Sequence, residues 1–194
     1  RPNTIIDWNS FGIAAGQTLR FDQESAASRV LNRVTGGTRS DILGSLLSNG
    51  QVLLVNPNGI AIGPQGRVDA AGFIASTLAL SDADFLAGRL RFGDAGLAAR
   101  GGIDNAGVIL GQGGLVALVG AQVAQSGRID APGGRIALAA GRSVEIFDAH
   151  SPSIRVVLDA GGGRDADGRV HTLLQTGRLS AAALPAVEAE AAGL

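Results

Sequence analysis

The chain has 194 residues, of which 30 are glycine, and its formal net charge is −1. Apart from two histidines its basic side chains are arginines scattered among acids, so no surface for a polyanion such as nucleic acid is indicated. The absence of cysteine excludes disulfides, thiolate metal sites and cysteine nucleophiles, and no apolar run is long enough for a membrane-spanning helix. One domain with a core of Val, Ile, Leu and Ala is expected.

Two short aliphatic strands are predicted at residues 52–55 and 60–62, and Asn56-Pro57-Asn58-Gly59 lies between them. Pro57 presets φ for the second position of a turn, Asn58 is tolerated at the third, and Gly59 can take a positive φ where the chain leaves the turn. The four residues are therefore predicted to form a corner. Both Asn side chains could bond to backbone groups of this corner or of a neighbouring coil.

The stretch 78–102 interrupts the strand pattern and is expected to leave it. Leu90 and Phe92 alternate with arginines, which favours a small hairpin. Alternation in the strand 52–55 leaves two aliphatic side chains facing outward, and the hairpin is expected to cover such a surface. Asp82 and Asp84 follow Ser81 and are interpreted as a polar loop or the start of a short helix, in preference to a cation site.

A repeat of twenty residues follows, because the phrase that begins at Asn105 matches the phrase that begins at Gln125 without a gap. Aliphatic residues two apart in each copy lie on one face of a strand. The matched pairs predicted to form the core ladder are Ile109 with Ile129, Val116 with Ile136, and Leu118 with Leu138. Short strands that turn repeatedly at a fixed period predict an all-β parallel β-helix, with about eight coils before residue 160.

The end of the chain is less regular. The segment from Gly161 has aspartates spaced like loop ligands but lacks a full calcium-binding pattern, and His150 and His171 have no partner at ligand spacing, so no metal site is expected. We expect a β-helical domain over residues 1–160. Residues 161–194 are expected to form a further coil or an Ala/Gly-rich tail.

Four phrases resemble, in order and spacing, the secretion domain of filamentous-haemagglutinin-like exoproteins of two-partner secretion systems. They are IIDWNSFGIAAGQTLRF, VLNRVTGG, ILGSLLSNGQVLLVNPNGIAIGPQGRVDAAGFIAST and LSDADFLAG. The resemblance covers roughly residues 3–160 and implies a right-handed parallel β-helix. Family members carry several tens of residues ahead of the first phrase, so the first coil is expected to lack its cap.

The resemblance also implies a function. The domain would lie near the amino terminus of a large secreted or surface protein, often an adhesin, that crosses the periplasm. Its partner would be an outer-membrane transporter with periplasmic POTRA domains, and a host glycan or receptor could be bound by the full-length protein. The motif associated with secretion and folding corresponds to Asn56, Pro57, Asn58, Gly59 and Ile60. A second family phrase corresponds to Leu31, Asn32, Arg33, Val34, Thr35 and Gly36.

A β-helical module that binds or cleaves polysaccharide is the alternative. Such modules need a groove lined by acids, basic residues and usually aromatic platforms, whereas this chain has one Trp and no Tyr. No nucleophile-elbow serine and no phosphate-binding glycine motif occurs. We therefore expect no enzyme activity, no cofactor and no small-molecule substrate.

Overall fold

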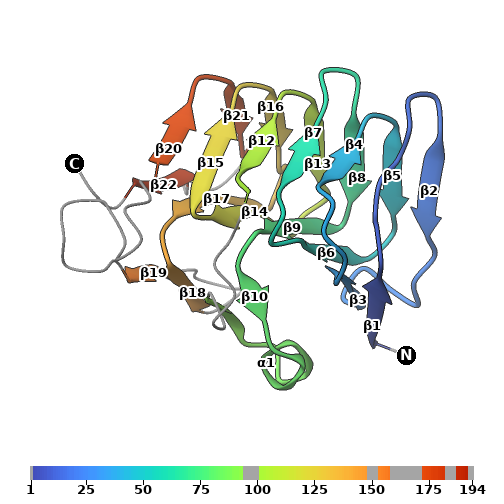
Figure 1. Cartoon of the computed structure of the whole chain (residues 1–194), viewed down its shortest axis with the longest axis horizontal. Helices are drawn as coiled ribbons and strands as arrows, with labels where there is room; N and C mark the ends of the chain where they lie inside the picture. The colour runs from blue at the N-terminus through green and yellow to red at the C-terminus, as the bar shows by residue number, and fades with distance from the viewer. Residues whose placement is uncertain (1, 94–100, 148–152, 158–171, 182–186, 192–194) are drawn as a thin grey trace.

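The computed structural model describes residues 2–93, 101–147, 153–157, 172–181 and 187–191, and in these the chain winds into a stack of coils (Figure 1). Each coil contributes strands to up to three parallel sheets that run along the stack. Glycine and asparagine bends separate strands of three to six residues, so every side chain that points inward meets its counterpart in the next coil. The predicted parallel β-helix is confirmed.

The three parallel sheets are named A, B and C, and their strands are given in spatial order. Sheet A contains β1 (Asn3–Trp8), β3 (Arg29–Val34), β6 (Gln51–Val55), β9 (Gly72–Ser76), β14 (Leu115–Gly120), β17 (Arg135–Ala140) and β22 (Val187–Ala191). Sheet B contains β4 (Ser40–Ile42), β7 (Ile60–Ile62), β12 (Ile103–Asn105), β15 (Gln122–Gln125) and β20 (Thr172–Gln175). Sheet C contains β2 (Thr18–Phe21), β5 (Ser45–Ser48), β8 (Arg67–Ala70), β13 (Val108–Gly111), β16 (Arg128–Asp130) and β21 (Arg178–Ser180).

The number of coils differs from the prediction. Six strands of sheet A lie before residue 160 in the described part of the chain, so about eight coils was an overestimate. Two excursions from the stack, between β9 and β12 and between β17 and β20, use residues without adding a coil. Strands β20, β21 and β22 then pair in parallel with β15, β16 and β17, so a further coil is built from residues beyond 161.

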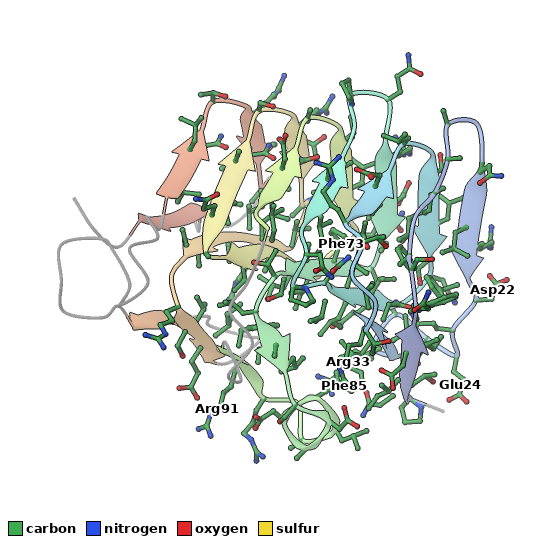
Figure 2. All side chains as sticks on the ribbon, viewed as in Figure 1. Asp22, Glu24, Arg33, Phe73, Phe85 and Arg91 are labelled. Atoms are coloured by element: carbon green, nitrogen blue, oxygen red, sulfur yellow. The ribbon has the colours of Figure 1, made fainter. Side chains whose placement is uncertain are left out.

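The interior of the stack is an aliphatic core in which vertical neighbours are register partners. Ile109 pairs with Ile129, Val116 with Ile136 and Leu118 with Leu138. All six belong to one buried cluster, and the most exposed of them shows 2% of its surface. Phe73 occupies the same cluster near the middle of the stack (Figure 2). Backbone bonds between coils and burial of apolar area at about 25 cal/mol per Å² stabilise the coils only as a stack.

A second apolar cluster covers the outer face of sheet A. The excursions supply α1 (Asp82–Leu86) and a four-stranded antiparallel sheet, here called sheet D, with the order β10 (Ala79–Leu80), β11 (Leu90–Gly93), β18 (Ser143–Phe147) and β19 (Ser153–Val157). Leu53 and Val55 pack outward into this cluster, while Val52 and Leu54 face the inner core. The expected cover is confirmed, but it is larger than one hairpin because β18 and β19 extend it. Ser81 caps α1, so the short helical start at Asp82 is also confirmed.

Candidate functional site

The Asn56–Gly59 stretch is a tight corner between β6 and β7. The amide of Gly59 donates to the carbonyl of Asn56 at 3.1 Å, which closes the turn. Gly59 takes a φ of +113°, a conformation that residues with a Cβ rarely adopt. A side chain there would also approach the carbonyl oxygen of Gly102 and the Arg39 side chain. The backbone conformation therefore favours glycine at this position, and a side chain would also press on these neighbours.

Asn56 is completely buried and its amide side chain is fully used. The Nδ2 group donates to the carbonyl oxygen of Thr38 at 3.0 Å and to Oγ of Ser40 at 2.9 Å. The Oδ1 atom accepts from the backbone amide of Asn58 at 2.9 Å and from its side chain at 3.1 Å. Because a buried amide without partners costs free energy, this position requires an Asn that fits all these partners at once.

Asn58 joins the two family phrases. Its Nδ2 group donates to the carbonyl oxygen of Gly36 at 2.7 Å, across 22 residues of sequence. Gly36 itself has no room for a side chain, since a Cβ would lie 2.0 Å from the carbonyl oxygen of Asn9. The corner of the third coil is thus bonded to the corner of the second, and that corner rests on the first.

The next coil closes over the same corner. The backbone amide of Asn56 donates to the carbonyl oxygen of Ser76 at 2.9 Å, where the first excursion leaves the stack. Where the excursion returns, Gly101 donates to the carbonyl oxygen of Pro57 at 3.1 Å and Gly102 accepts from Ile60 at 3.1 Å. The corner therefore contacts the coils on both sides, and it fixes both ends of an excursion.

Ile60 and two residues of the second phrase serve the apolar clusters. Ile60 is completely buried in the inner core between Ser40 and Ile103. Val34 points into the same core, whereas Leu31 points outward and lies beneath the cover formed by the excursions. The phrase therefore supplies apolar contacts on both faces of sheet A.

The polar residues of the second phrase bind neighbouring coils. The Asn32 side chain accepts from the indole Nε1 of Trp8 at 3.0 Å and donates to the carbonyl oxygen of Leu53 at 3.3 Å, so it joins β1, β3 and β6. Thr35 donates through both its backbone amide and its hydroxyl to the carbonyl oxygen of Trp8, at 2.8 and 3.1 Å. These bonds attach the second coil to the first.

Arg33 connects the coils to the cover. Its guanidinium group donates to Asp7 of β1 at 3.3 Å, to the carbonyl oxygen of Leu80 at 3.2 Å and to the Asp82 carboxylate. Nearby, the Arg29 guanidinium lies 5.6 Å from the centre of the Phe85 ring, and burial lowers the pKa of this arginine. Arginines of β3 therefore bind α1 by charge and by cation–π contact.

The surface beside the corner contains a hollow and arginine–aspartate ion pairs. A hollow of about 470 Å³ is lined by residues that include Arg39, Asn58, Asp104 and Leu174. Arg39 pairs with Asp41 at 2.6 Å, and similar arginine–aspartate pairs join residues two apart on β8 and β16. In the described segments, no three acidic or histidine side chains form a metal-binding group, and no helix could span a membrane. His150, His171 and the aspartates after Gly161 lie outside the described residues.

The sequence interpretation missed two features of this region. The bonds of Arg33 to Asp82 and Leu80 cross 49 and 47 residues, and no local pattern signals such contacts. Asn105 and Gln125 form a buried side-chain bond of 2.6 Å. That contact was detectable, since the two residues occupy the same position in the aligned repeats.

A parallel β-helix with a hydrogen-bonded Asn-Pro-Asn-Gly corner and a covered outer sheet defines the class of this protein as a β-helical domain. A family model described as the TPS secretion domain matches residues 1–192, and the chain belongs to this family. It is a secretion domain of a two-partner secretion exoprotein. The family is one of transport modules whose exoproteins are secreted with the help of an outer-membrane transporter.

Solved and curated relatives agree with this placement. The crystal structure of the HMW1 secretion domain from Haemophilus influenzae matches with a TM-score of 0.76 and 39% identity, over 80% of this chain and 42% of that chain. A heme/hemopexin-binding protein of Haemophilus influenzae strain Rd is 46% identical over 76 residues, which is 39% of this chain and 8% of that protein. A second heme/hemopexin-binding protein from this species is 42% identical over 72 residues, 37% of this chain and 8% of that protein. The chain thus spans less than a tenth of these curated relatives.

Proposed function

We propose that this domain is the amino-terminal secretion signal of a large exported adhesin-like protein, and that the POTRA domains of its transporter recognise it in the periplasm. Outside the cell the domain starts the folding of the β-helix, and later coils stack on it. Display on the cell surface and binding of a host glycan or receptor would belong to the full-length protein. The β-helical region is proposed to be the part that the transporter binds.

The observation that supports this proposal is the set of bonds at the Asn56–Gly59 corner. Its side-chain amides bond to Gly36, Thr38 and Ser40, which lie 16 to 22 residues earlier in the chain. Short sequence separation keeps the entropy cost of closing each coil low. A chain delivered unfolded could therefore add one coil upon another, each secured to the coil that precedes it.

Capture by POTRA domains tests the proposed partner. The purified domain, both refolded and freshly diluted from urea, is passed over immobilised POTRA repeats of the transporter encoded beside its gene. We expect retention of at least one of the two forms, and none on POTRA repeats from an unrelated outer-membrane assembly protein. Failure of the cognate repeats to retain either form would contradict the proposal while leaving family membership and fold unaffected.

A further inference from the structure

One column of residues inside the stack changes its chemistry halfway along. The column lies at the end of each sheet B strand, on the side that faces the core. Ile13, Ile42 and Ile62 occupy it in the first three coils and are buried. Asn105, Gln125 and Gln175 occupy it in the next three. The remaining inward positions of sheet B are aliphatic in all three of the later coils.

The first two amides bond to each other along the stack, and the first and last also bond to the backbone of their own bends. The backbone amide of Gly107 donates to Oδ1 of Asn105 at 3.1 Å. Nδ2 of Asn105 donates to Oε1 of Gln125 at 2.6 Å. At the far end, Nε2 of Gln175 donates to the carbonyl oxygen of Gly177 at 2.8 Å. Asn105 thus both accepts and donates, Gln125 accepts through Oε1, and Gln175 donates through Nε2.

The link between the second and third amides is open. Nε2 of Gln125 and Oε1 of Gln175 are both buried and have no hydrogen-bond partner among the described residues. They belong to register partners on adjacent strands, and one is a donor while the other is an acceptor. A bond between them would complete a ladder of three amides along the stack.

We propose that this amide ladder sets the order in which coils stack. It gives the native register a lower free energy than the register in which a coil is skipped. The aliphatic ladders cannot do this, because they present similar surfaces in every coil. If β15 stacked directly on β7, Val123 would still meet Ile60, but Gln125 would meet Ile62. Oε1 of Gln125 would then lose its donor, Nδ2 of Asn105, and would be buried against an aliphatic side chain, at a cost in free energy. The change from Ile62 to Asn105 therefore marks where the fourth coil must be inserted.

This inference concerns assembly of the fold and does not depend on the proposed transporter. In a repetitive fold, a coil can stack on the wrong neighbour, and the ladder would oppose this error. The first excursion leaves a long connection between β9 and β12, so the fourth coil could loop out without breaking the chain. A buried polar ladder is a known way in which a core can specify one register at some cost in stability.

Cysteine cross-linking can read the register, since the chain has no native cysteine. Ala61, Asp104 and Ala124 point outward at equivalent positions of β7, β12 and β15. Adjacent strands lie about 4.8 Å apart, within reach of a disulfide, whereas strands two coils apart lie beyond the limit of about 7 Å. The pair Asp104→Cys with Ala124→Cys reports the native register. The pair Ala61→Cys with Ala124→Cys reports a skipped coil.

Each reporter pair is refolded from urea under mild oxidation, in the parent and in a variant with Asn105→Ile, Gln125→Leu and Gln175→Leu. We expect the skipped-coil disulfide to rise about fivefold or more in the variant, as loss of the penalty for an unpaired amide implies. The fraction of molecules with the native-register disulfide should fall by as much as the fraction with the skipped-coil disulfide rises. Val123→Ala serves as the matched control, because it weakens the same strand without touching an amide, and should leave the skipped-coil disulfide at the parent level.

Two results would overturn the proposal. Unchanged yields of both disulfides in the triple variant would show that the aliphatic ladders alone determine the register. Loss of both disulfides, in the triple variant and also in the single variant Gln125→Leu, would show that the amides stabilise the stack without selecting its register.

Discussion

Replacing Asn56 with alanine should destabilise the whole stack. The side chain is completely buried and makes four hydrogen bonds, two to the preceding coil and two to Asn58. Alanine removes these bonds and leaves the Thr38 carbonyl and the Ser40 hydroxyl facing a small void. The bonds inside the corner fix its shape, and the bonds to Thr38 and Ser40 fix its position on the coil below.

The expected loss follows from typical hydrogen-bond energies. A net contribution of about 0.5–1.5 kcal/mol per bond, reduced for bonds that share atoms, gives a loss of about 2–4 kcal/mol in the free energy of unfolding. For a domain of this size, each kcal/mol lowers the melting temperature by about 2–4 °C. The melting temperature of Asn56→Ala should therefore fall by about 4–16 °C.

Urea unfolding followed by the fluorescence of Trp8 measures this loss. Trp8 is the single tryptophan, and its indole bonds to Asn32 and meets the Phe11 ring edge-on at 5.5 Å, so it reports on the first two coils. Gln65→Ala is the control, since Gln65 is an exposed turn residue of the same coil. A shift below about 0.5 kcal/mol, the usual range of surface substitutions, would refute the claim that this side chain secures adjacent coils.

Three further predictions concern other parts of the stack. Leu118→Ala should lower the free energy of unfolding by about 2–5 kcal/mol in the same urea assay, because Leu118 is completely buried in the inner ladder. Gly59→Ala should lower the melting temperature measured by circular dichroism, at a cost of at least about 1 kcal/mol, because of its φ of +113°. Asp84 accepts from Arg89 at 2.7 Å and from Ser81 at 2.8 Å, and these bonds lower the pKa of its carboxyl. The stabilising effect of its carboxylate should be complete above the unfolded pKa and should be lost as the pH falls through the lower folded pKa. The free energy of unfolding, measured at a series of decreasing pH values, should therefore become equal for the wild type and Asp84→Asn at the acid end.

The coils themselves could be predicted because their signal is local. Aliphatic residues two apart, a repeat of twenty residues and turn residues at each bend all lie within one or two coils of sequence. The pairs Ile109–Ile129 and Leu118–Leu138 follow from this period, and the structure places both pairs in register. The outward direction of Leu53 followed from the same alternation.

The cover could be predicted only in part, because its contacts are distant in sequence. The hairpin around Leu90 and Phe92 was visible as alternation, but β11 also pairs with β18, and Arg91 bonds to Glu145 across 54 residues. Nothing local to residues 143–147 indicates that they leave the stack. Counting coils at a constant period therefore failed at both excursions.

The corner itself was predictable as a turn, but its partners were not. Pro57 and Gly59 indicate the turn by their backbone preferences. The bonds from Asn58 to Gly36 and from Asn56 to Ser40 depend on how the second and third coils align, which a single sequence does not reveal. The family resemblance marked both phrases, and the structure adds that one side chain connects them.

The central claim is that the two family phrases support secretion by holding adjacent coils together at one corner. Export tests it most directly, using Asn58→Asp, which removes the donor to Gly36 and sets a carboxylate against two oxygens at nearly unchanged size. In cells that carry the partner transporter, the amount of domain in the medium should fall strongly for Asn58→Asp and stay at the wild-type level for Gln65→Ala. Wild-type export of an Asn58→Asp domain that unfolds more easily in urea would contradict the claim.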